Sequence, residues 1–184
     1  MSIIYGRRIR LRAIERSDVE KFHQWVNDPE VTAGLALYLP MSFREEEKWF
    51  EEIANRPKEE MPFAIERREK KDDWRLIGNC GIFGIDWRAR SGEIGIMIGE
   101  KSVWDQGYGT ESVQTLVRHG FETLNLNRLF LRVYGENRRA QRAYEKAGFV
   151  LEGCLRQAVY KHGRYDDVLI MSILRSEWNM EGRA

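Results

Sequence analysis

A short glycine-containing segment between two differently patterned runs most constrains how this chain can fold. Residues 105–111 read Asp-Gln-Gly-Tyr-Gly-Thr-Glu. The apolar run before them, residues 94–99, has the pattern of a buried strand, and residues 112–124 place apolar side chains at helical spacing. Glycines leave backbone N–H groups accessible, and a helix N-terminus adds free amides and the positive end of its dipole. The pattern therefore predicts a strand, loop and helix that together bind a phosphate group.

Two common nucleotide-binding loops do not match this segment. A P-loop requires a lysine directly after its last glycine, whereas Thr110 follows Gly109. A dinucleotide-binding fingerprint requires a third glycine where this chain has Ser112. A tight turn before a helix also explains Gly107 and Gly109, so the segment alone leaves both interpretations open.

A second strand and helix follow the first pair. Residues 129–134 are strand-like, Asn137 suits a helix N-cap, and Gly148 suits the position just after the helix C-terminus. The glycine loop with its helix, followed by the pattern N-x-x-A-x-x-x-Y-E-K-A-G-F, resembles the GCN5-related N-acetyltransferase (GNAT) superfamily. The similar branch contains ribosomal-protein N-terminal acetyltransferases and spermidine acetyltransferases. Further matching segments, in the order that this branch shows, are residues 10–12 with Asp18, 25–31, 76–79, 93–95, and 165–168 with Met171.

This resemblance implies an α/β (α+β) fold in a single domain, residues 1–184. Its sheet is expected to be mixed, mostly antiparallel and twisted, with about seven strands, about four flanking helices and a splay between two central parallel strands. The length of 184 residues is suitable for one domain with a substantial core. The expected strands are residues 9–13, 63–66, 76–83, 93–98, 129–134, 150–155, 158–160 and 168–174. The expected helices are residues 17–27, one that begins with a capping box at Ser42 and Glu45, 112–124, and one after Asn137.

The resemblance further implies an acetyl-CoA-dependent N-acetyltransferase that acts on a primary amine of a protein N-terminus or a small molecule. Transfer is expected to be direct, in a ternary complex, because neither cysteine lies in a nucleophile motif. Residues implied for the pyrophosphate are Gln106, Gly107, Tyr108, Gly109 and Thr110, and for the pantetheine Ile96 and Met97 through the main chain and Asn137 through its side chain. One arginine of the basic edge formed by Arg138, Arg139 and Arg142, taken here as Arg142, is expected at the 3′-phosphate.

Two residues are candidates for proton transfer. Asn137 and Tyr144 are seven residues apart, about two helical turns, and therefore lie on one helix face. By family analogy Tyr144 protonates the sulfur of the leaving CoA, a task that suits a phenol because it is protonated at neutral pH. Glu93 is the candidate base, directly or through water. The alternatives are that Tyr144 only packs in the core and that Glu93 is a solvent-facing charge at a strand end.

The acceptor is less defined by the sequence. Asp28 and Glu30 are candidates for attracting a cationic amine, although both also fit ordinary turn and helix-cap positions. Leu37 belongs to an apolar segment, residues 35–40, that fits a peptide N-terminus or an amino-sugar. The first-helix region lacks a dense acidic cluster, and polyamine and aminoglycoside acceptors stay open as alternatives.

Composition limits the other classes of function. Lys and Arg number 30 against 29 acids, a net charge of +1, which predicts neither nucleic acid nor membrane as a partner. No apolar run approaches the ~20 residues of a membrane span. Cys80 and Cys154 lack metal-ligand companions, so we expect buried free thiols, no metal and a cytoplasmic location. A homodimer and a non-catalytic acyl-CoA sensor are further hypotheses.

Overall fold

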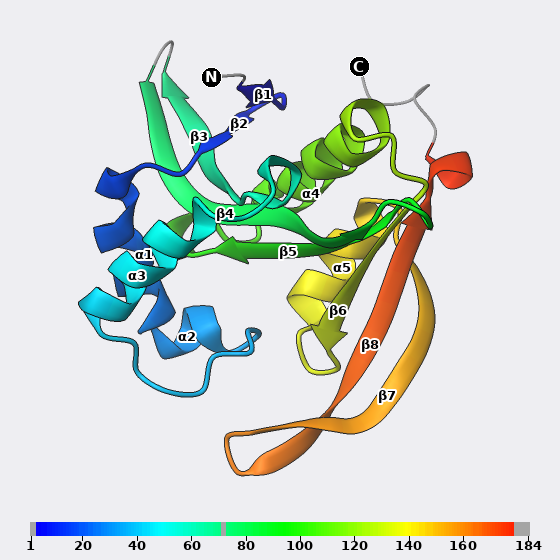
Figure 1. The fold of residues 1–184 in the computed structure, drawn as a ribbon. Coiled ribbons are helices and arrows are strands. Elements are labelled where there is room, and N and C mark those ends of the chain that lie inside the picture. The colour runs from blue at the N-terminus through cyan, green and yellow to red at the C-terminus, as the bar shows by residue number, and fades with distance from the viewer. Residues whose placement is uncertain (1–2, 71–72, 179–184) are drawn as a thin grey trace.

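The computed structural model describes residues 3–70 and 73–178 and shows one curved sheet with helices on both faces (Figure 1). The strand order is β1-β2-β3-β4-β5-β6-β8-β7, and all neighbours are antiparallel except β5 and β6, which are parallel. The strands are β1 (Ile4–Tyr5), β2 (Ile9–Ala13), β3 (Phe63–Lys70), β4 (Asp73–Asp86), β5 (Ser91–Ile98), β6 (Arg128–Tyr134), β7 (Val150–Lys161) and β8 (Arg164–Leu174). The α-helices are α1 (Val19–Val26), α2 (Pro29–Thr32), α3 (Phe43–Ile53), α4 (Tyr108–Arg118) and α5 (Arg138–Lys146).

The two faces of the sheet bury different cores because side chains alternate along a strand. On β5, Ile94 belongs to the large core with α4 and α5, and Ile96 packs against that core. Met97 lies in the smaller core on the opposite face, together with Phe22 and Trp25 of α1. One strand therefore contacts both layers, and its backbone lies at the centre of the molecule.

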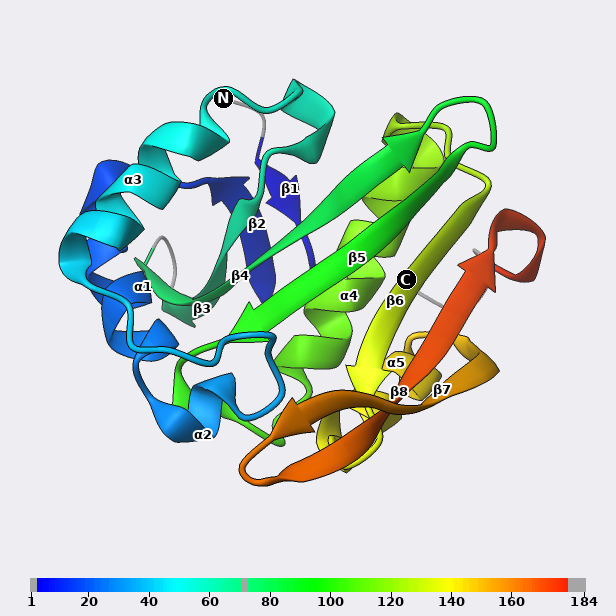
Figure 2. The same cartoon turned by 60° about the horizontal axis from the view of Figure 1, so that its bottom comes forward.

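The central parallel strands separate along their length, as predicted. β5 and β6 pair only through Ser91, Gly92 and Glu93 of β5, with Arg128 and Phe130 at the two ends of the matching stretch of β6. Beyond this point the two strands diverge toward the N-terminal end of α4 (Figure 2). The second half of β5 therefore presents main-chain groups that β6 does not use, and such groups need other partners.

Several element boundaries differ from the sequence predictions. The sheet has eight strands rather than about seven: the short β1, which pairs with β2, was not predicted, and seven further strands account for the eight predicted segments. The segments predicted at 150–155 and 158–160 form one strand, β7, whose pairing with β8 is interrupted near Gln157, which has a φ of 52°. The additional helix α2 is a single turn. The sequence between β3 and β4, residues 70–73, has the charged pattern of a turn, and its residues 71–72 lie outside the described residues.

The remaining local predictions have mixed outcomes. The capping box of α3 is present, with Ser42 and Glu45 each bonded to the other's backbone. Cys80 is a buried free thiol as predicted, but Cys154 is exposed, because β7 is the edge strand of the sheet. No helix in residues 3–70 and 73–178 is long and apolar enough to cross a membrane.

Candidate active site

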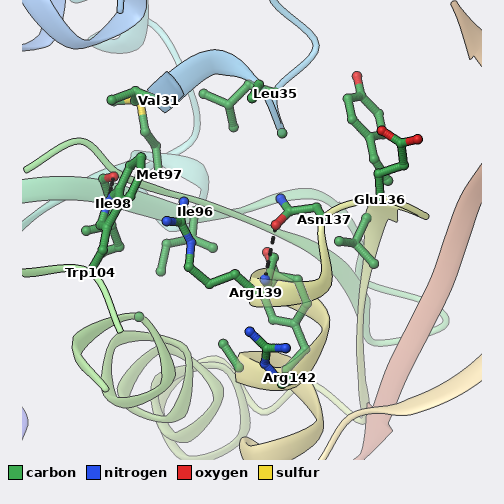
Figure 3. Close-up of a pocket in the computed structure, with 18 of the residues that line it drawn as sticks. Val31, Leu35, Ile96, Met97, Ile98, Trp104, Glu136, Asn137, Arg139 and Arg142 are labelled. Carbon is green, nitrogen blue, oxygen red and sulfur yellow. Dashed lines mark hydrogen bonds between the residues drawn. The ribbon is translucent and has the colours of Figure 1, made fainter. Parts of the chain in front are cut away.

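A cleft of about 480 Å³ lies where β5 and β6 separate. Its walls come from the second half of β5, the end of β6, the N-terminal ends of α4 and α5, α2 with the loop that follows it, and the β7–β8 hairpin. Figure 3 shows Ile96, Met97 and Ile98 on one side of the cleft and Asn137 and Arg142 on the other. The separated strands, the glycine loop and one face of α5 therefore line a single cleft.

The glycine loop ends in a residue that must be glycine. Gly107 is the N-cap of α4 and has a φ of 84°, a left-handed conformation in which an L side chain is strained. The helix begins at Tyr108, four residues earlier than predicted, so Gly109 and Thr110 belong to its first turn rather than to the loop. The amides of this turn have no carbonyl one turn earlier to accept from them. They are free to bind an anion.

An arginine from the other end of the chain supports this cradle. Arg8 Nη1 donates to the carbonyl of Gln106 at 3.2 Å, and its guanidinium lies 4.5 Å from the ring centre of Tyr108. Arg8 also donates to the Glu111 carboxylate through its backbone amide at 2.5 Å and through Nε at 2.8 Å. Glu111 is therefore a structural charge, and the cradle is held by a residue about a hundred positions away.

The N-terminal turn of α5 forms the opposite wall. Asn137 caps this helix by accepting from the Ala140 amide at 3.1 Å, which confirms the predicted N-cap. Its amide nitrogen approaches the loop after α2 so closely that a Cβ at Gly34 would lie 2.2 Å from it. Gln141 fixes the start of α5 to the end of β6 by donating to the carbonyls of Tyr134 and Gly135 at 2.9 and 2.8 Å.

Basic side chains of α5 reach into the cleft. The Arg139 guanidinium lies 3.5 Å from the ring centre of Trp104, and Trp104 Nε1 donates to the Ile98 carbonyl at 2.8 Å. Figure 3 shows Arg139 extending across the cleft toward β5. Arg142 and Lys146 also line the cleft, whereas Arg138 donates to the side chain of Gln141.

Tyr144 lies in the cleft wall with its ring buried. Only 9% of the residue is exposed, and its ring centre is 6.1 Å from that of Phe149. Among the described residues its hydroxyl has no hydrogen-bond partner. Burial raises the pKa of Tyr144 to about 12, because removal from water disfavours the phenolate. The phenol is therefore protonated at neutral pH and free to donate into the cleft.

Glu93 lies at the point where the two parallel strands part. It is the last β5 residue paired with β6, opposite Phe130, and its carboxylate is 3.3 Å from the guanidinium of Arg132. Arg132 lines the cleft but Glu93 does not. Since Glu93 lies outside the cleft lining, its role as base, directly or through water, stays a prediction.

Of the three residues predicted to contact the acceptor, only Glu30 lines the described cleft. Asp28 caps α2 by accepting from the Glu30 amide at 2.9 Å, and both carboxylates contact Lys101 Nζ, at 2.7 and 2.5 Å. The hydrogen bond from Lys101 lowers the pKa of Asp28. Glu30 lines the cleft, whereas Asp28, Leu37 and Gln106 do not. A single lysine thus pairs with both acids and offsets one of their two negative charges.

Sequence reasoning did not single out three residues of the cleft region, namely Arg8, Trp104 and Lys161, and it named Arg139 only as part of the basic edge of α5. Helical spacing was enough to find Arg139, since Arg139, Arg142 and Lys146 follow the helical period of one face. Arg8, Trp104 and Lys161 act across long separations in the chain, so no local pattern indicates them. Within residues 3–70 and 73–178 no group of three His, Cys, Asp or Glu residues is placed to hold a metal.

A mixed sheet that opens between parallel strands over an amide cradle defines an acyltransferase that binds its donor in the opening. The acetyltransferase (GNAT) domain profile matches residues 8–150, and the chain belongs to this family. It is an N-acetyltransferase that uses acetyl-CoA as co-substrate.

Individual relatives agree with this assignment. An uncharacterized N-acetyltransferase, p20 of Bacillus licheniformis, is 31% identical over 97% of this chain and 99% of its own length. The spermidine N(1)-acetyltransferase of Vibrio cholerae is 31% identical over 92% of this chain and 95% of its own. The crystal structure of spermidine N-acetyltransferase from V. cholerae, in complex with CoA and spermine, superposes with a TM-score of 0.82 at 30% identity, over 92% of this chain and 97% of that one. The resemblance seen in the sequence is confirmed.

Proposed function

We propose that residues 1–184 form one N-acetyltransferase domain that transfers the acetyl group directly to a primary amine, with Tyr144 as the general acid. The observation that carries this proposal is the buried, protonated phenol without a hydrogen-bond partner in the described chain, placed in the wall of the cleft. Direct transfer is supported by the cysteines, since neither Cys80 nor Cys154 lines the cleft. Burial also raises the pKa of the Cys80 thiol and keeps it from acting as a nucleophile.

The residues present fit acetyl-CoA in three places. The free amides at the start of α4 suit the pyrophosphate, because oriented N–H groups and the helix dipole bind phosphate oxygens. The main chain of Ile96 and Met97 lies in the half of β5 that has no β6 partner and suits the amides of pantetheine. Asn137 Nδ2 suits a carbonyl of the same arm. Bound acetyl-CoA supplies a thioester, from which an amine takes the acetyl group.

The chain's own residues would move the protons of the reaction. Tyr144 Oη donates a proton to the departing sulfur, which is a better leaving group as a thiol than as a thiolate. The incoming ammonium must first lose a proton, and Glu93 accepts it through water. After attack the nitrogen carries one further surplus proton, and this proton returns to the Tyr144 phenolate as the C–S bond breaks and the amide forms. The buried ring of Tyr144 keeps its hydroxyl in one place, which favours transfer over a short distance.

The function is tested by measuring CoA thiol release from acetyl-CoA against a panel of amines. The panel contains peptides with free N-termini, spermidine, an aminoglycoside and a nucleotide amino-sugar. We expect one class of primary amine to exceed the others clearly. Acetyl-CoA binding without amine-dependent thiol release would instead support a non-catalytic acyl-CoA sensor. Spermidine is the acceptor named for the V. cholerae relative, and this panel compares it with the other candidates directly.

The assignment of Arg142 to the 3′-phosphate leads to a specific prediction. Arg142→Ala should weaken binding of CoA about tenfold, since a hydrogen bond between charged groups contributes about 1.5–3 kcal/mol. Binding of 3′-dephospho-CoA should change little. Arg138→Ala is the matched control, because Arg138 lies on the same helix but outside the cleft lining. Calorimetry with both ligands measures the difference, and equal losses for CoA and dephospho-CoA would contradict the assignment.

The proposal includes a homodimer formed through β7. This edge strand exposes Val150, Leu151 and Leu155 at 57%, 55% and 47%, and exposed apolar edges favour pairing between chains. Sedimentation equilibrium should give twice the chain mass of 21.7 kDa, and Leu155→Lys should give the monomer. A monomeric wild type would contradict the dimer.

We further propose a cytoplasmic enzyme without nucleic-acid or membrane partners. Two free thiols favour a reducing compartment. The balanced charge offers no surface for a polyanion.

A further inference from the structure

A lysine of the β7–β8 hairpin lies at the side of the cleft that is formed by α2, the loop after it and this hairpin. We call this side the acceptor side, because the residues predicted to contact the acceptor lie in and next to α2. Lys161, the last residue of β7, donates from Nζ to the carbonyl of Thr32 at 2.5 Å and to that of Leu35 at 2.7 Å. In Figure 2 the hairpin turn lies next to α2 and the loop that follows it. The ammonium group thus connects the β7–β8 hairpin to the region of α2 and the loop after it, about 130 residues away in the sequence. Both segments line the cleft.

Two tyrosines complete the surroundings of this ammonium. Lys161 Nζ lies 5.5 Å from the ring centre of Tyr38 and 6.0 Å from that of Tyr134. The two hydroxyl groups are 3.4 Å apart, so the rings are linked at their outer ends. Carbonyl oxygens together with aromatic rings are the groups that bind alkylammonium ions in proteins. The cluster of Thr32, Leu35, Tyr38 and Tyr134 is therefore an ammonium site, and the chain fills it with its own cation.

The charge of Lys161 is not balanced by a carboxylate. Within the described part of the chain Lys161 forms no ion pair, whereas the neighbouring Arg164 pairs with Glu136 and Arg132 pairs with Glu93. Burial without such a partner lowers the pKa of Lys161. An acceptor that enters this side of the cleft therefore meets the fixed positive charge of Lys161. Without Lys161, the carbonyls and aromatic rings at this place would be available to bind a second ammonium group of a polyamine.

We propose that Lys161 determines acceptor specificity by occupying an ammonium site, so that the wild-type cleft selects primary amines with one positive charge over diamines and polyamines. This inference rests on the proposed transfer to a primary amine. The site itself takes a second class of ligand, an alkylammonium ion, once Lys161 is removed.

The test compares α,ω-diamines of three to eight carbons with the monoamines of the same length, in wild type and in Lys161→Met. Methionine keeps most of the alkyl stem and removes the charge. We expect the ratio of kcat/KM for the best diamine to that for its monoamine to rise tenfold or more in the variant. Lys48→Met is the control for loss of a positive charge, since Lys48 is exposed on α3, where it pairs with Glu52. That control should leave the ratio unchanged.

Two further measurements keep the inference independent of folding and of turnover. The double variant Tyr38→Leu/Lys161→Met also removes one of the two aromatic rings of the site, and Tyr38 is exposed, so the fold should tolerate the change. This variant should lose the rise in the diamine-to-monoamine ratio of kcat/KM. Calorimetry with 1,4-diaminobutane should detect tighter binding to Lys161→Met than to wild type even if neither protein turns over, an outcome that would sink the proposed transfer but not the ammonium site. The inference is overturned if Lys161→Met unfolds at the same temperature as wild type but shows the same diamine-to-monoamine ratio of kcat/KM and the same affinity for 1,4-diaminobutane.

Discussion

Tyr144→Phe is expected to lower kcat by about 10²–10⁴-fold while leaving acetyl-CoA affinity nearly unchanged. The magnitude is that of a lost general acid. The ring is buried against Phe149, and its hydroxyl has no hydrogen-bond partner in the described chain, so phenylalanine fills the same space without leaving a donor unpaired. Thermal unfolding should therefore shift little. The measurements are initial rates of CoA release, calorimetry with acetyl-CoA and a melting curve.

Tyr165→Phe is the matched control, since it deletes the same hydroxyl from an exposed tyrosine of β8. It should retain wild-type kcat. Unchanged turnover in Tyr144→Phe would show that the leaving sulfur takes its proton from elsewhere. A large fall in acetyl-CoA affinity would instead make Tyr144 a binding residue.

The pH profile provides a second check on Tyr144. A general acid must be protonated, and burial raises the pKa of this phenol from its ordinary value of ~10 to about 12. The required form therefore persists at pH values where an exposed tyrosine would already be ionised. We expect no fall in kcat attributable to this group between pH 7 and 10. A descending limb centred near 10 that disappears in Tyr144→Phe would contradict the buried setting.

Gly107→Ala is expected to weaken acetyl-CoA binding about ten- to a hundredfold. Alanine in the left-handed conformation costs about 1–2 kcal/mol, and its Cβ would lie 3.3 Å from Nη2 of Arg8, the residue that holds the loop. Relief of this strain rotates the amides at the start of α4. Each charged hydrogen bond lost there costs about 1.5–3 kcal/mol, and 1.4 kcal/mol corresponds to tenfold in affinity.

Gly84→Ala separates this local effect from general destabilisation. Gly84 also has a positive φ, 58°, with nothing within 4 Å of its added Cβ, and it lies on β4 away from the cleft. Both variants should unfold at lower temperature, but only Gly107→Ala should lose cofactor affinity. Equal affinities in the two variants would show that the loop amides do not bind the cofactor.

Much of the fold was predictable because local patterns match local structure. Helix caps depend on residues three or four positions apart, so Ser42 and Asn137 identified the starts of α3 and α5 correctly. The start of α4 was placed too late, because a glycine in a helical first turn is indistinguishable in sequence from one in a loop. The exposure of Cys154 was wrong because an apolar neighbourhood in sequence does not show which strand lies at a sheet edge.

The sequence by itself determined the family, the order of the elements and the residues expected on the cofactor side of the cleft. Apart from Ile96 and Met97, those residues lie in two short motifs, residues 105–111 and 137–149, in which the chemically relevant side chains are close together in the sequence. Only the tertiary structure decided how Arg8 supports the glycine loop, how Lys101 pairs with Asp28 and Glu30, and how Lys161 fills the acceptor side. These contacts join residues about 70 to 130 positions apart. Their energies depend on distance and burial in space, which no local pattern records.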